Sequence, residues 1–384
     1  MSPRKPRLPF ANEWFFPAAA LYATLLLPWS VLTLLGLVPA LPGLATPAGH
    51  AHEMLFGFAL AVVAGYLLGP QRLNLTIALL ACWLLARLCF LFWPGSWLTT
   101  VASAAFAAGL TWKVVPRFLG AAKKWRNQTV APVVIGLSLL SAVAGLALAR
   151  PFASTLVHEA LLLLALLMFF MGGRILAPAI AGHALSHGRT QDARVQPRIE
   201  GAVLTLLIVA LLLTLLSPWL AIAKFTGGLM LLAGVLTIIR LLRWRPWQCL
   251  VRPDLLVLLL GYAWLALGLV LTGLAIAGLL PLTAMLHSIT VGALGSLTFG
   301  VMARTRLIYR FRDANARPWI HPVVLLISLA ALARMAPSFP GTDQRLWLLG
   351  AAVCWSLAFL TLAVLLWRTR GAPPNSGRRM SEAD

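Results

Sequence analysis

Apolar stretches of roughly 18 or more residues recur from one end of the chain to the other, and each is long enough to cross a bilayer as a helix. Of the 384 residues, 60% are hydrophobic and only 11% are charged. This composition lies outside the range of soluble globular domains. The short alternating segments of a transmembrane β-barrel are not seen in the sequence. The sequence therefore predicts an all-α integral membrane protein.

Twelve transmembrane helices can be placed in the sequence. They lie near 16–38, 51–69, 73–93, 97–115, 130–149, 156–180, 201–218, 222–242, 254–280, 282–303, 321–337 and 345–367. Together they form one polytopic domain over residues 1–370. Residues 371–384, rich in Gly, Pro, Ser and Arg, are predicted to be a disordered cytoplasmic tail. The first apolar stretch is longer than the core of a signal peptide, so it is interpreted as an uncleaved first span.

The net charge of +21 does not indicate nucleic-acid binding, because the basic residues are spread over short loops that offer no room for a binding domain. Of the 31 Lys and Arg residues, 25 lie at the two termini and in every second loop. The intervening loops carry only four, namely Arg150, Lys224, Arg334 and Arg345. This alternation follows the positive-inside rule and predicts that both termini are cytoplasmic.

Four histidines are predicted to lie at one depth beneath the outer surface. His50 and His52 open the second span, whereas His158 and His287 follow Pro151 and Pro281 by seven and six residues. Helical rise places the latter two roughly 9–10 Å along their helices. The other histidines, His183, His187 and His321, are expected to be solvated loop residues.

Carboxylates and an arginine share the depth of the four histidines. Glu53 and Glu159 adjoin histidines, and Arg87 lies near the outer end of the third span. A buried arginine needs a carboxylate, a carbonyl or an anion as its partner. Arg87 is therefore expected to pair with Glu53, with Glu159, or with a carboxylate of a bound cofactor.

His50 and His52 cannot face the same point from one regular helix, because residues two apart point about 200° apart. Pro47-Ala48-Gly49 interrupts the chain just before them. We expect His50 in the turn and His52 in the first helical turn, reaching two metals, or one metal and one partner. Imidazole suits haem iron, copper and zinc.

Small residues line one face of two spans: Gly57, Ala61 and Gly65, and then Gly292, Ser296 and Gly300. This spacing is typical of close helix packing, and it would also leave room for a flat macrocycle. Three arginines near the predicted cytoplasmic ends, Arg174, Arg304 and Arg306, are expected to extend to the lipid headgroups.

Three stretches of the sequence are distinctive. They are His-Ala-His-Glu-Met-Leu-Phe-Gly-Phe at 50–58, Gly-Gly-Arg-Ile-Leu-Ala-Pro at 172–178, and His-Ser-Ile-Thr-Val-Gly-Ala-Leu-Gly at 287–295, which continues to Arg304. All three resemble stretches of the NnrS family of bacterial inner-membrane proteins, which are linked to nitric oxide and described as containing haem and copper, and the first is the most specific. At 307–312 the chain lacks a histidine that the family often carries.

The resemblance implies a haem protein (b-type), with copper as a second candidate metal, in the bacterial cytoplasmic membrane, with nitric oxide or a related small molecule as its partner. His52 and His287 lie in the matching stretches and are the first choices as metal ligands, with His50 as a third, suited to copper. His158 has the support of depth alone. Arg87 or Arg150 is the candidate to hold a haem propionate.

Two alternatives stay open at this stage. A secondary transporter would also have twelve spans, and its His, Glu and Arg side chains would form a substrate or proton site. A regulatory or assembly factor would bind metal without turnover, and sequence does not separate it from an enzyme. The sequence does not identify an electron donor.

Overall fold

The computed structural model describes residues 8–120, 128–147, 153–191 and 194–371, and the described chain is helical throughout, without strands. The first half contains α1 (Asn12–Leu34), η1 (Pro42–Leu44), α2 (Pro47–His52), η2 (Glu53–Ala59), α3 (Leu60–Leu67), α4 (Leu73–Phe92), α5 (Trp97–Gly120), α7 (Val130–Ala147) and α8 (Ala153–Ser186). The second half contains α9 (Pro197–Leu216), α10 (Ala223–Arg243), η3 (Pro246–Cys249), α11 (Pro253–Ile276), α12 (Leu282–His287), η4 (Ser288–Ala293), α13 (Leu294–Phe311), η5 (Pro318–Val323), α14 (Val324–Met335), η6 (Ala336–Ser338) and α15 (Gln344–Arg368).

The predicted all-α membrane fold is confirmed. Eleven helices or unbroken helical runs in the described part are long and apolar enough to cross a membrane. The predicted fifth span corresponds to α7, whose fully described part, Val130–Ala144, is shorter than the others. The predicted tail lies outside the described residues, apart from its first residue.

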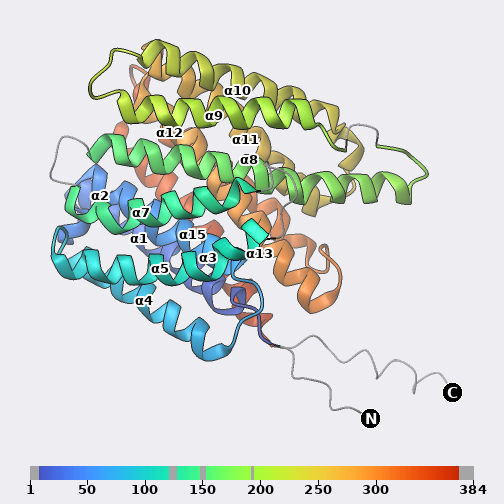
Figure 1. The fold of residues 1–384 in the computed structure, drawn as a ribbon, viewed down its shortest axis with the longest axis horizontal. Coiled ribbons are helices and arrows are strands. Elements are labelled where there is room, and N and C mark those ends of the chain that lie inside the picture. The colour runs from blue at the N-terminus through green and yellow to red at the C-terminus, as the bar shows by residue number, and fades with distance from the viewer. Residues whose placement is uncertain (1–7, 121–127, 148–152, 192–193, 372–384) are drawn as a thin grey trace.

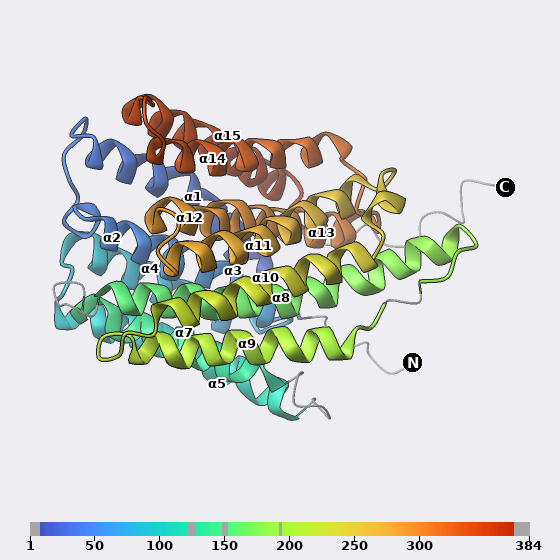
Figure 2. The same cartoon turned by 90° about the horizontal axis from the view of Figure 1, so that it is seen from above.

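The long helices run side by side, with α4 and α5 along one edge in Figure 1, α9 and α10 along the other, and α8 between them. Seen from above, α14 and α15 form one face, and α5 and α9 lie at the opposite face (Figure 2). The side chain of Arg370 lies 4.5 Å from the ring of Trp14, so α1 begins at the end of the bundle where α15 ends. We call this the basic end, and the opposite end, where α2 and α12 begin, the histidine end.

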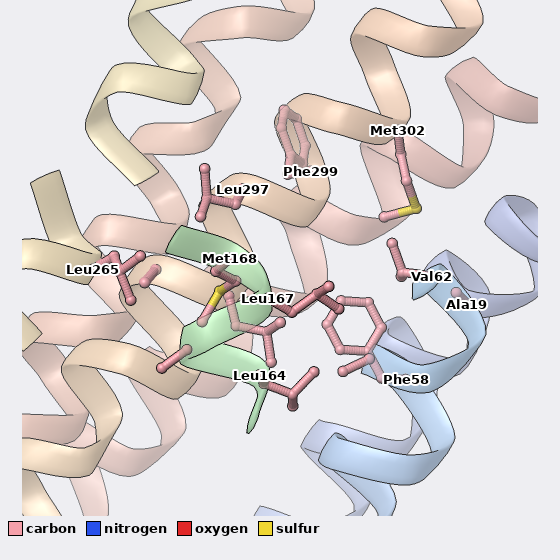
Figure 3. Packing of buried hydrophobic residues seen from close by; sticks show 14 of the residues in the cluster. Ala19, Phe58, Val62, Leu164, Leu167, Met168, Leu265, Leu297, Phe299 and Met302 are labelled. Atoms are coloured by element: carbon pink, nitrogen blue, oxygen red, sulfur yellow. The ribbon is translucent and has the colours of Figure 1, made fainter. Parts of the chain in front are cut away.

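Helix α8 is the central element of the core. Its side chains Leu164, Leu167 and Met168 lie between Phe58 on one side and Leu265 on the other (Figure 3). The helix has 34 residues, and at 1.5 Å per residue it is about 50 Å long. It therefore exceeds the hydrocarbon thickness and projects beyond its neighbours at the basic end (Figure 2).

Two spans change from α-helix to π-helix just after their histidines. The run α2–η2–α3 contains one π-helix and the run α12–η4–α13 contains the other. A π-turn adds a residue to the turn and redirects the side chains before and after it, and such turns are frequent at functional sites. In η2, the indole of Trp83 donates a hydrogen bond to the carbonyl of Gly57 at 3.0 Å.

The small-residue faces are closely packed, as predicted. A Cβ added at Gly57 would lie 2.6 Å from the ring of Tyr22, and one at Gly292 would lie 2.5 Å from the ring of Trp264. Both distances are too short for a methyl group, so these glycines allow an aromatic ring to lie against the backbone. Helix packing, rather than an open slot, occupies these faces.

The expectations for four residues of the basic end are wrong. His183 and His321 are only 7% and 4% exposed, so they are not solvated loop residues. Arg306 is 2% exposed, and Arg304 pairs with Asp254, so neither extends freely to the headgroups. The physical reason is that α8 and α13 continue past their predicted ends, to Ser186 and Phe311, and keep His183, Arg304 and Arg306 inside the bundle. His321 lies in η5, which packs against α11.

Candidate functional site

A cavity of about 180 Å³ at the histidine end is lined by side chains from α1, α2, α12 and α14. Its polar lining includes His50, His287 and Arg334, and most of the remaining wall is apolar, with Met54 and Phe58 among its members. The structure thus brings together two of the predicted ligand histidines, although 237 positions in the sequence separate His50 from His287.

His287 is held in one tautomer by its neighbours. Its Nδ1 lies 2.6 Å from the carbonyl of Thr283, which can only accept, so Nδ1 carries the ring proton. Its Nε2 then accepts a hydrogen bond from Nη2 of Arg334 at 2.9 Å. The ring is a neutral imidazole whose lone pair points at a cation on the cavity wall.

His50 is oriented by a hydroxyl from α1. Its Nδ1 lies 2.8 Å from Oγ of Ser30, and Ser30 is fully buried. This contact fixes the ring from its Nδ1 side and leaves Nε2 as the nitrogen for a ligand. His50 and His287 therefore share a pattern in which Nδ1 is engaged by the protein.

His52 points away from this cavity, as the 200° argument predicts. Its ring is 1% exposed and stacks on the ring of Phe90 with centroids 3.7 Å apart. Its Nδ1 lies 2.8 Å from Oε1 of Glu53, and its Nε2 has no hydrogen-bond partner among the described residues. An imidazole with a carboxylate on one nitrogen and a free second nitrogen is typical of metal ligands.

Glu53 is the centre of a buried polar network. Its Oε1 accepts a hydrogen bond from Nη1 of Arg87 at 2.7 Å, and its Oε2 accepts one from the hydroxyl of Tyr22. Glu53 and Arg87 are 0% and 1% exposed. The prediction that Arg87 pairs with Glu53 or Glu159 is confirmed for Glu53. Each charge compensates the other where neither is hydrated.

The candidates for a propionate partner change accordingly. Arg87 is not among the residues that line the cavity, because its guanidinium is held by Glu53 and approaches Oγ of Ser103 at 3.5 Å. Arg150 lies outside the described residues. Arg334, which the sequence analysis placed in a loop, lies in α14 and lines the cavity.

His158 and Glu159 lie on α8 beside a second cavity. His158 lines this space of about 210 Å³, which is separated from the first by Leu161 and Leu286, the two residues common to both walls. Its Nδ1 lies 2.6 Å from the carbonyl of Ser154. Glu159 is 3% exposed, and its Oε1 lacks a partner within the described part of the chain. The four histidines therefore do not share one site: His50 and His287 line one cavity, His158 another, and His52 neither.

Sequence reasoning missed Ser30, Tyr22, Phe90 and Arg334. Serine, tyrosine and phenylalanine in an apolar span carry no signal of their own. Arg334 did carry a signal, since it is an arginine in the helix formed by Val324–Met335. Among the described residues, no group of three or more His, Cys, Asp or Glu side chains that could hold a metal is found.

The fold and the site define a polytopic α-helical membrane protein with a buried His–Glu–Arg network and a histidine-lined cavity at one end. The family model described as NnrS protein matches residues 8–371. The chain belongs to the NnrS family, and this membership makes it a membrane protein of the nitric oxide response. None of the curated proteins matches the chain.

Proposed function

We propose that the protein binds haem in the bacterial cytoplasmic membrane, with both termini in the cytoplasm and the metal site near the periplasmic face. The observation that supports this most directly is the cavity into which α2 and α12 bring His50 and His287. Both rings have Nδ1 engaged by the protein, so Nε2 is the nitrogen of each ring that a metal would take, although Nε2 of His287 accepts a hydrogen bond from Arg334 in this structure. A hydrogen-bonded second nitrogen is the usual arrangement of metal-ligating histidine.

The donor set fits haem. Porphyrin nitrogens occupy four positions on the iron, so one or two imidazoles complete its coordination. The wall is mostly apolar, as a macrocycle requires, and the cavity of about 180 Å³ would have to widen to hold one. Arg334 offers the fork-shaped donor that recognises a carboxylate. For His287 to ligate iron, Arg334 must leave Nε2, and a propionate would give it a new partner.

Copper is the second metal that the family implies. Met54 lines the same cavity as His50 and His287. Two imidazoles and a thioether form a set that suits copper, because copper(I) favours soft ligands. His52 remains a predicted ligand for a separate metal, with Glu53 as the carboxylate behind its ring.

Bound iron or copper would supply the chemistry on nitric oxide. The protein's contribution is to hold the ligand rings and to limit water. Thr283 and Ser30 fix the two ring orientations, and the apolar wall excludes water from the space between them. An uncharged gas can reach this end of the bundle from the lipid or from the periplasm.

An absorption spectrum of the purified protein, expressed with adequate haem supply, tests the proposal. We expect a Soret band that is lost or shifted in His287→Ala and in His50→Ala. His187→Ala is the matched control, because His187 is exposed and lies just beyond α8 at the other end. Absence of the band in the wild type would refute haem binding, and equal spectra in all three variants would refute this site.

Turnover is tested separately by measuring nitric oxide consumption with an added electron donor. An enzyme consumes nitric oxide above background in the wild type and loses this activity in His287→Ala. A haem-loaded protein without consumption is instead a sensor or an assembly factor. Localisation is tested by fusing reporters of cytoplasmic and periplasmic location to each terminus.

A further inference from the structure

A third cavity, at the basic end of the bundle and away from His50 and His287, has a lining that suits an anion. Its volume is about 370 Å³, and its polar lining is Asn12, Tyr66, Arg304, Thr305, Tyr309 and Arg312. We propose that this cavity binds the phosphate group of an anionic phospholipid, with the first methylene groups of an acyl chain in the adjacent apolar space between α3, α8 and α13.

Arg304 is positioned for an anion before any ligand arrives. Its Nη1 donates a hydrogen bond to Oδ2 of Asp254, which is 2% exposed. Asp254 is itself held by Arg252 at 2.9 Å and by the amide of Asn315 at 2.9 Å. These contacts fix the guanidinium at the cavity wall, so Arg304 loses little conformational entropy when an anion binds.

The charge at this cavity is positive. Asp254 is shared by two arginines, Arg252 and Arg304, so the trio carries an excess of one positive charge. Arg312 lines the cavity and adds another. Arg174, in the Gly-Gly-Arg stretch, is close enough to Tyr66 to interact with it electrostatically. Tyr309 is hydrogen-bonded to the carboxylate of Glu13, so an oxyanion would use these charges together with the hydroxyl groups of Tyr66 and Thr305.

Arg312 has an unusual backbone for an arginine. It ends α13 with φ = 60° in the left-handed region, where glycine is the residue normally favoured. Holding a residue with a side chain there costs of order 1 kcal/mol or more. Arginine at position 312 is therefore less favourable for folding than glycine would be. Contact between its guanidinium and a ligand would explain why arginine is present.

The neighbouring space identifies a lipid rather than a soluble phosphate. An apolar cavity of about 90 Å³ lies beside the arginine-lined cavity and shares three wall residues with it, Tyr66, Ile175 and Val301. The remaining wall of this apolar cavity is mostly Leu, Val and Met from α3, α8, α11 and α13. A polar chamber that adjoins an apolar one matches an amphiphile with an anionic head and a hydrocarbon chain.

Native mass spectrometry of the full chain in detergent tests the proposal, with phosphatidylglycerol and phosphatidylcholine titrated separately. We expect one saturable phosphatidylglycerol per chain and at least tenfold weaker binding of phosphatidylcholine. Arg312→Gln should weaken phosphatidylglycerol binding by about tenfold, the loss expected for one charge-assisted hydrogen bond. Arg243→Gln is the control, because it also removes one positive charge and Arg243 is exposed at the end of α10.

Arg312→Gly separates binding from folding. Glycine relieves the left-handed backbone, so the thermal midpoint of the ligand-free protein should stay level or rise while lipid affinity falls. Equal affinities for the two lipids, or equal losses in Arg312→Gln and Arg243→Gln, would overturn the proposal. So would full displacement of the lipid by millimolar inorganic phosphate, which would identify a soluble anion as the ligand. None of these outcomes depends on haem content.

Discussion

Arg87 carries the positive charge that pairs with the buried carboxylate of Glu53. Replacing it in Arg87→Met removes the guanidinium and keeps a side chain of similar apolar length. Glu53 would then keep the hydroxyl of Tyr22 and the ring of His52 as partners, but no permanent positive charge would remain beside it.

The expected loss of stability is about 3–5 kcal/mol, the range for removing one partner of a buried ion pair. The two remaining donors place this chain near the lower limit, at about 3 kcal/mol. Adding Glu53→Gln to Arg87→Met removes the unpaired charge, so the double variant should regain part of the loss, about 1–2 kcal/mol. The buried ion pair therefore predicts that the double variant is more stable than Arg87→Met alone.

The assay is equilibrium unfolding in mixed detergent micelles with increasing denaturing detergent, followed by circular dichroism. Arg243→Met serves as the control, since Arg243 is exposed and should change the free energy of unfolding by less than about 0.5 kcal/mol. A loss below about 1 kcal/mol in Arg87→Met would refute the reasoning. A double variant less stable than Arg87→Met would refute it as well, because it would show that Glu53 does not depend on Arg87 for its charge.

Three further predictions concern packing and caps, and thermal denaturation followed by circular dichroism measures each. Gly292→Ala should destabilise the protein by about 1–3 kcal/mol because the added methyl group meets an indole ring, whereas Gly350→Ala, where the added Cβ meets nothing within 4 Å, should be neutral or stabilising. Trp83→Phe leaves the carbonyl of Gly57 without its indole donor and should cost about 1–3 kcal/mol. Asp343→Ala removes the N-cap of α15, whose carboxylate accepts from two backbone N–H groups, and should cost about 1 kcal/mol. Unchanged thermal midpoints in Gly292→Ala, Trp83→Phe or Asp343→Ala would contradict the contact assigned to that residue.

The sequence predicted the site only in part. Imidazole and carboxylate are costly in hydrocarbon, so the depth of His50, His52, His158 and His287 could be read from their positions along apolar stretches. Which rings meet could not, because lateral neighbours in a bundle depend on how all the helices pack. His52 was preferred over His50 as a partner of His287, whereas the structure brings His50 to the shared cavity.

The π-helices are a second reason why the sequence did not predict which histidine rings meet. We expect His50 in the turn before the helix, whereas α2 begins at Pro47 and holds both histidines. The π-helices η2 and η4 then add a residue to a turn and change the direction of the side chains around it. No local pattern of apolar residues predicts a π-turn. Each of these turns contains a glycine, Gly57 or Gly292, that lies against a ring from another helix, Tyr22 or Trp264. These contacts exist only in the folded bundle.

The sequence by itself determined the class of fold. Apolar length specifies a span because an unpaired backbone group in hydrocarbon costs several kcal/mol, and a continuous helix satisfies every such group locally. Tertiary structure alone decided that Arg87 pairs with Glu53 rather than Glu159, and that His50 lies at the same cavity as His287. It also decided that Arg334 of α14 lies at the wall of that cavity. Those contacts join residues from separate helices, and in lipid the packing of side chains, rather than apolarity, selects which helices are neighbours.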